Sequence, residues 1–79
     1  MAMTDIGNGS FVNADRIVAL AGPDSMPVRR LIQDAKENGR LIDVSCGKKT
    51  ACVIVTDNGY VILSAEATKT IRERIMKDE

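Results

Sequence analysis

The candidate functional residues of this chain are its cations, which include the adjacent pair Lys48 and Lys49. Lys48 and Lys49 lie between two apolar runs, 41–45 and 50–56, each of a length typical of a strand. Neighbouring lysines in a turn are mobile point charges that suit phosphate oxygens, whereas Arg16, at the start of another apolar run, offers a planar fork. Strand ends of an antiparallel sheet can gather at one edge. We therefore expect these three cations to bind a polyanion, the plainer alternative for the lysines being a solvated turn.

The charge distribution permits such a site only because the cations are concentrated. Eleven Lys and Arg balance eleven Asp and Glu, so the net charge is zero. Between Arg16 and Lys49, however, seven cations stand against four acids. Arg29 and Arg30 open a predicted helix, where a cation opposes the helix dipole at a cost of up to about 1 kcal/mol. We expect this arginine pair to contact DNA or a neighbouring subunit, or else to form a solvated face.

Other kinds of chemistry have little support. The chain has no His, the usual proton shuttle near neutral pH, and no Ser or Cys is paired with a base, so we expect no enzyme, no catalytic residue and no cofactor. Cys46 and Cys52 cannot close a tetrahedral site, which argues against a metal and for two small buried hydrophobes. The segment 47–50 lacks the upstream glycine and the following helix of a P-loop. One Phe and one Tyr are too few to stack single-stranded nucleic acid.

The size of the chain favours self-association. Its 79 residues form one domain, 1–79, of which we expect residues 1–5 to be frayed. A chain this short buries only about 60% of its unfolded surface, and small domains often compensate by assembling. A homo-oligomer would also multiply a few phosphate contacts by avidity. Because neither a leader nor a long apolar run is visible, we expect a cytoplasmic protein without a membrane segment.

Patterning predicts an α+β fold. Four apolar residues at helical spacing predict a helix over 26–38, which Asn38-Gly39 ends. Asp57-Asn58-Gly59 is typical of a hairpin, Asn-Gly being the preferred two-residue turn. Residues 6–10 read as a loop or a glycine-broken strand. The remaining predictions are strands over 11–12, 17–21, 41–45, 50–56 and 60–65, and a C-terminal helix over 68–76. With hairpin-type connections, this order predicts a small, mainly antiparallel sheet with one central and one C-terminal helix.

Five segments of the chain, taken in their order and spacing, resemble the RemA family, the extracellular matrix regulatory proteins of bacteria. They are Asn13-Ala-Asp-Arg16, Pro27-Val-Arg-Arg-Leu-Ile-Gln-Asp-Ala35, Gly39-Arg-Leu-Ile-Asp43, Gly47-Lys-Lys-Thr50 and Val61-Ile-Leu-Ser-Ala65. The resemblance covers about 6–75. It implies a LytTR-like subunit, assembly into a ring with DNA around its outside, and DNA-binding regulation of transcription that promotes biofilm matrix genes.

By the same resemblance, the family's DNA-contacting arginine falls on Arg16 and its arginine pair falls on Lys48 and Lys49. Lysine keeps the charge but loses the fork, so phosphate binding should survive while any guanine readout weakens. We therefore predict a nucleoid-associated, homo-oligomeric regulator that binds double-stranded DNA. The rival prediction is a structural or interaction module whose basic turn binds a neighbouring subunit or an acidic protein, without DNA.

Overall fold

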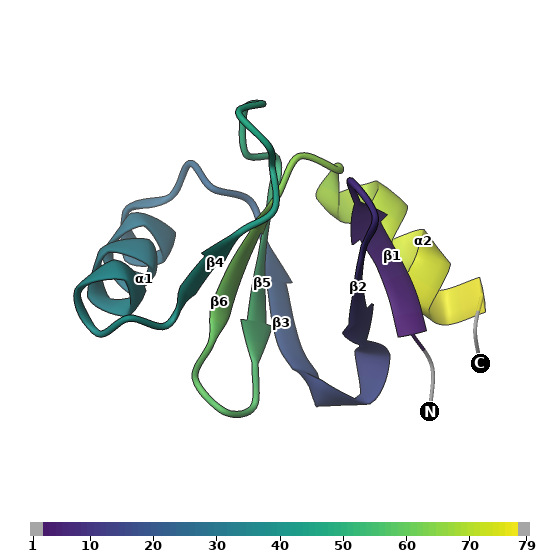
Figure 1. The fold of residues 1–79 in the computed structure, drawn as a ribbon, viewed down its shortest axis with the longest axis horizontal. Coiled ribbons are helices and arrows are strands. Elements are labelled where there is room, and N and C mark those ends of the chain that lie inside the picture. Colours follow the sequence, from purple (N-terminus) through teal and green to yellow (C-terminus); the bar gives the residue numbers. More distant parts are fainter. Residues whose placement is uncertain (1–2, 78–79) are drawn as a thin grey trace.

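The structure is a computed structural model that describes residues 3–77, and Figure 1 shows how its elements are arranged. The strands are β1 (Met3–Gly7), β2 (Ser10–Asn13), β3 (Ile17–Ala21), β4 (Leu41–Asp43), β5 (Cys52–Thr56) and β6 (Val61–Ser64). The helices are α1 (Met26–Glu37) and α2 (Thr68–Lys77), and a 3-10 turn, η1 (Ala14–Arg16), joins β2 to β3. The predicted α+β class, with one central and one C-terminal helix, is confirmed.

The six strands of residues 3–77 form two sheets. β1 and β2 make an antiparallel hairpin, and the larger sheet has the order β3-β5-β6-β4. In the larger sheet, β5 is antiparallel to both of its neighbours, whereas β4 is parallel to β6. Pairing is therefore mainly antiparallel, as predicted, and the edges of the larger sheet are β3 and β4.

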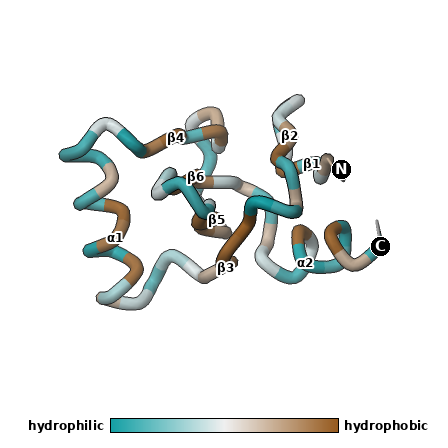
Figure 2. The backbone as a smooth tube through the Cα atoms, turned by 90° about the horizontal axis from the view of Figure 1, so that it is seen from below, coloured by the Kyte–Doolittle hydropathy of each residue, from teal (hydrophilic) through white to brown (hydrophobic). Residues whose placement is uncertain are grey.

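Apolar side chains project from both faces of the larger sheet, so each face has its own core. On one face, Val53, Val61 and Leu63 pack with Ala35 of α1. The opposite face packs against the β1–β2 hairpin and α2, through a cluster of Ile6, Cys52, Ile54, Ile62 and Ile71. Figure 2 shows α1 on one side of the strands and the hairpin with α2 on the other. This alternation along β5 and β6 follows from the two-residue period of a strand.

Helix α1 begins where the sequence predicts and ends one residue earlier. The Ser25 hydroxyl accepts a hydrogen bond from the amide of Val28 at 3.4 Å, which caps the first turn. Pro27 lies in that turn, where no intrahelical donor is needed. Asn38 caps the end of the helix, and Gly39 follows with a φ of 69°, the left-handed backbone that glycine adopts without strain. The helix is thus fixed by local signals at both ends.

The first strand and the tight turn differ from the prediction. Residues 3–5 belong to β1 and are not frayed, while residues 1–2 lie outside the described residues. The two-residue hairpin turn is Asn8-Gly9, where both φ angles are positive, 53° and 76°. The Asp57-Asn58-Gly59 connection has three residues between the hydrogen-bonded Thr56 and Tyr60, and of these three only Gly59 has a positive φ. The two-residue turn was therefore predicted at Asn58-Gly59, where the connection has three residues, and was missed at Asn8-Gly9.

The two strands that flank the lysine pair are not neighbours, because β6 lies between them (Figure 1). β6 is buried at all four positions, which suits a central strand, whereas β4 is half exposed and suits an edge. β4 cannot lead into β5 through a tight turn, because β6 lies between the two strands. The chain therefore crosses the end of β6 between β4 and β5, and Lys48 and Lys49 lie in this crossing loop rather than at a hairpin tip.

Candidate nucleic-acid interface

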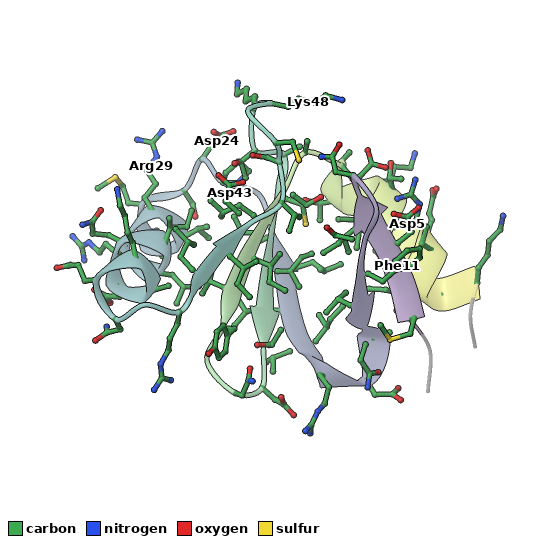
Figure 3. All side chains as sticks on the ribbon, viewed as in Figure 1. Asp5, Phe11, Asp24, Arg29, Asp43 and Lys48 are labelled. Carbon is green, nitrogen blue, oxygen red and sulfur yellow. The ribbon has the colours of Figure 1, made fainter. Side chains whose placement is uncertain are left out.

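The crossing loop, residues 44–51, is called the basic loop below. Lys48 and Lys49 are both exposed, and Figure 3 shows the Lys48 side chain beyond the end of the sheet. Within residues 3–77, neither lysine has an ion-pair partner. Their charges are therefore available to an external anion.

Hydrogen bonds hold the basic loop at both ends. The amide of Val44 donates to the carbonyl oxygen of Leu63 at 2.9 Å, and the amide of Ala51 donates to that of Ser64 at 2.8 Å. The amide of Lys48 closes a turn onto the carbonyl oxygen of Ser45 at 3.1 Å. The lysines are thus carried by an anchored loop, which lowers the conformational entropy that binding must remove.

A carboxylate fixes the entry to the basic loop. Oδ1 of Asp43 accepts hydrogen bonds from the Ser45 hydroxyl at 2.6 Å and from the Ser45 amide at 2.9 Å. The hydroxyl first, and then the amide, hold the pKa of Asp43 below its usual value, since both stabilise the ionised form. Ser45 itself is buried, so this contact ties the exposed end of β4 to the protein interior.

Asn8 is a residue of this region that the sequence did not single out. Its Nδ2 donates to the carbonyl oxygen of Val44 at 2.9 Å, across 36 residues of chain. The turn of the β1–β2 hairpin therefore supports the basic loop, and with Lys48 it borders a polar pocket of about 330 Å³. The paired glycines around Asn8 were the one signal for a turn here, but no local pattern predicts its partner.

Arg16 lies at the opposite end of the sheet from the lysine pair. Its carbonyl oxygen accepts a hydrogen bond from the amide of Asp57, and its Nη1 donates to Oδ2 of Asp57 at 3.0 Å. Asp57 follows the last residue of β5, whereas the basic loop precedes the first. At about 3.3 Å per residue, β5 alone separates the two by roughly 13 Å. The expectation that these cations gather at one edge is therefore wrong within one subunit.

Arg29 and Arg30 are exposed in the first turns of α1. Figure 3 shows Arg29 projecting toward the same end of the molecule as Lys48. Asp24, from the segment that precedes α1, lies between them in the same view. Arg29 is thus the cation of the α1 pair that could extend the basic surface.

The two cysteines have different environments. Cys52 is fully buried in β5, where burial raises the pKa of its thiol, so it is the small core hydrophobe that we expected. Cys46 is exposed in the basic loop with a φ of 54°, so the prediction that it is buried is wrong. A tight turn before Gly47 leaves its side chain outside the core.

Comparison with known proteins assigns the chain to a family. The family described as Extracellular matrix regulatory protein A-like matches residues 3–75. The chain belongs to this RemA-like family. It is 48% identical over 75 residues to a protein of Synechococcus elongatus, which covers 95% of this chain and 86% of the relative. It is 47% identical over 77 residues to a protein of Nitratidesulfovibrio vulgaris, covering 98% of this chain and 90% of the relative.

Both relatives, and a third from Geobacillus thermodenitrificans at 44% identity over 75 residues, are named as candidate regulatory proteins. The third alignment covers 95% of this chain and 86% of the relative. The description of the family and the names of the relatives point to a regulatory role rather than to catalysis. Neither α1 nor α2, the helices of the described residues, is long and apolar enough to cross a membrane.

Proposed function

We propose that this RemA-like protein is a homo-oligomeric regulator of transcription that binds double-stranded DNA, with the basic loop as its main contact. The observation that carries the proposal is the exposed pair Lys48 and Lys49, adjacent on an anchored loop and without an ion-pair partner in residues 3–77. Lysine binds phosphate as a point charge, so we expect the loop to contact the DNA backbone rather than to read bases.

Exposed apolar side chains support assembly. Among residues 3–77, eight large hydrophobic residues are exposed by 37% or more: Met3, Phe11, Val18, Met26, Leu31, Ile42, Tyr60 and Met76. Val18 lies on the edge strand β3 and Ile42 on the opposite edge strand β4. An edge strand with exposed apolar residues is a surface that another chain can cover. Two different edges favour a head-to-tail contact, which closes into a ring when the rotation allows it.

Assembly would give the loop its function. A single subunit offers few phosphate contacts, and the affinity of a protein for DNA grows with the number of phosphates that it neutralises. Repeating the basic loop around a ring would let one duplex follow many loops and wrap the outside. We infer that the protein acts at the nucleoid, and the family name favours extracellular matrix genes, as in biofilms, as its targets.

One feature favours a second candidate function, an interaction module without DNA. The end of the sheet opposite the basic loop carries the exposed carboxylates of Asp15 and Asp57. These would offer an acidic contact to the lysines of a neighbouring subunit, and an acidic partner protein would offer the lysines a contact of the same kind. In that case the lysines would be part of the interface itself.

A titration with duplex DNA at two salt concentrations tests the proposal, with the mass of the protein measured in the same solution. We expect a defined oligomer whose DNA affinity falls steeply as salt rises, because bound phosphates release counterions. An oligomer that ignores DNA at low salt would refute DNA binding and leave the interaction module.

A further inference from the structure

The tip of the β5–β6 hairpin, residues 57–59, lies between two arginines from opposite edges of the sheet. Arg16 precedes the edge strand β3, and Arg40 precedes the edge strand β4. Each side chain contacts the tip that joins the two central strands. Arg40 was not among the candidate residues that the sequence suggested.

Arg16 holds the first residue of the tip. A backbone hydrogen bond of 2.9 Å from the amide of Asp57 fixes the two residues side by side. The ion pair between them is exposed, with 66% of the Arg16 side chain and 42% of the Asp57 side chain accessible to solvent. A guanidinium group has five N–H donors. Within residues 3–77 the Arg16 group has one hydrogen bond, from Nη1, so most of its donors face solvent.

Arg40 covers the last residue of the tip. Its Nη1 lies 2.7 Å from where a Cβ atom on Gly59 would stand, so the guanidinium group rests against the turn because residue 59 has no side chain. Within residues 3–77 Arg40 has no ion-pair partner. It borders a recess of about 360 Å³ that Asp34 also lines.

By the family resemblance, Arg16 is already a candidate DNA contact; we propose that Arg40 adds a second phosphate-binding group on the other side of the β5–β6 tip, and that the Asp57 carboxylate occupies Arg16 in the free protein. The proposal rests on the DNA binding proposed above. Carboxylate and phosphodiester oxygens accept hydrogen bonds from a guanidinium group in the same way, so the DNA backbone competes with Asp57 for Arg16.

Carboxylates make this site weaker than the basic loop. Asp15 adjoins Arg16 in η1, Asp57 pairs with it, and Asp34 lines the recess beside Arg40. Asp5 and Glu66 line the pocket beside Lys48, but the lysines of the basic loop have no ion-pair partner in the described residues, whereas Arg16 has one. A duplex therefore engages the loop first and the tip second, and Asp57 sets how much the tip adds.

The substitution Asp57→Asn tests the competition, because it removes the charge and keeps a residue that suits turns. We expect DNA affinity at low salt to rise about two- to fivefold, the range of one exposed ion pair. Glu73→Gln removes an exposed acid from α2 and serves as the charge control, with a smaller rise expected. In an Arg16→Gln background, the effect of Asp57→Asn should fall to that of the control.

Arg40→Gln tests the second arginine, with Arg72→Gln on α2 as its charge-matched control. For Arg40→Gln we expect the plot of log affinity against log salt to become shallower by about 0.9 for each subunit that contacts the duplex, since each of these subunits loses one phosphate contact. The same slope for both variants would remove Arg40 from the site.

Weaker binding by Asp57→Asn would show that Asp57 positions Arg16 and would overturn the competition. Both results require DNA binding by the unaltered protein, so they differ from a failure of the proposed function, in which that protein does not bind.

Discussion

Asn8 donates a hydrogen bond from Nδ2 to the carbonyl oxygen of Val44 at 2.9 Å, and this contact joins the first turn of the chain to the basic loop. Asn8 can do so because its φ of 53° puts it in the left-handed region, which asparagine tolerates better than most residues. The hairpin that covers one face of the sheet thereby also supports the loop that we propose to bind DNA. The position of the lysines depends on a residue forty positions away in the sequence.

Removing this support should loosen the basic loop without unfolding the protein. Asn8→Gly keeps the left-handed turn and deletes the donor. We expect it to lower the free energy of unfolding by about 0.5–1.5 kcal/mol, the value of one hydrogen bond, with glycine's extra chain entropy adding to it. Amide hydrogen exchange at Lys48 should become faster, while exchange within β5 and β6 stays slow. Unchanged exchange at Lys48 would mean that the bonds at residues 45 and 51 are sufficient to hold the loop.

The lysine pair should account for most of the salt dependence of DNA binding. Each phosphate contact contributes about 0.9 to the slope of log affinity against log salt, so Lys48→Ala with Lys49→Ala should lower the slope by about 2 for each subunit that contacts the duplex. The doubly substituted protein should keep its oligomeric mass. The control replaces Lys36 and Lys77, two exposed lysines of the helices, and should change the slope less. Loss of the oligomer, instead of DNA binding, would favour the interaction module.

The fold was predictable where its signals are local. The apolar stripe of α1 and the glycine after Asn38 are both read from neighbouring residues, and the helix lies where they predict it. The extent of β5 and β6 follows similarly from runs of branched apolar residues. Both helices and five of the six strands therefore needed no tertiary information.

The arrangement of these elements was not predictable, because it depends on partners far apart in the chain. Nothing in residues 41–45 shows that β4 pairs with β6 rather than with the next strand, β5. A strand buried on both faces has to be central, but its burial is known only once both layers are in place. For the same reason, the sequence could not show that Arg16 and the lysine pair lie at opposite ends of β5. The sequence thus indicated which cations could bind a polyanion, while the structure was needed to show where they lie relative to one another.

Acid should loosen the entry to the basic loop. The hydrogen bonds from Ser45 lower the pKa of Asp43 in the folded protein, so this carboxylate contributes stability above its unfolded pKa of about 3.9. That contribution is lost as the pH falls below this value and through the lower folded pKa. Ser45→Ala should return the pKa of Asp43 toward its usual value and reduce this part of the acid dependence. An NMR titration of the Asp43 carboxyl measures the shift directly; equal midpoints before and after the substitution would contradict the role of Ser45.

The edges of the larger sheet should carry the contacts between subunits. Val18 on β3 is 66% exposed and Ile42 on β4 is 42% exposed. Val18→Glu or Ile42→Glu places a charge on an edge and should shift the mass in solution toward the monomer, since burying an unpaired carboxylate is costly. Met76→Glu is the control, because Met76 is 62% exposed and belongs to α2 rather than to either edge strand. Circular dichroism and a cooperative thermal transition should show that each variant remains folded. If both edge variants keep the full mass, assembly instead uses another exposed apolar surface, such as that around Phe11 of the hairpin.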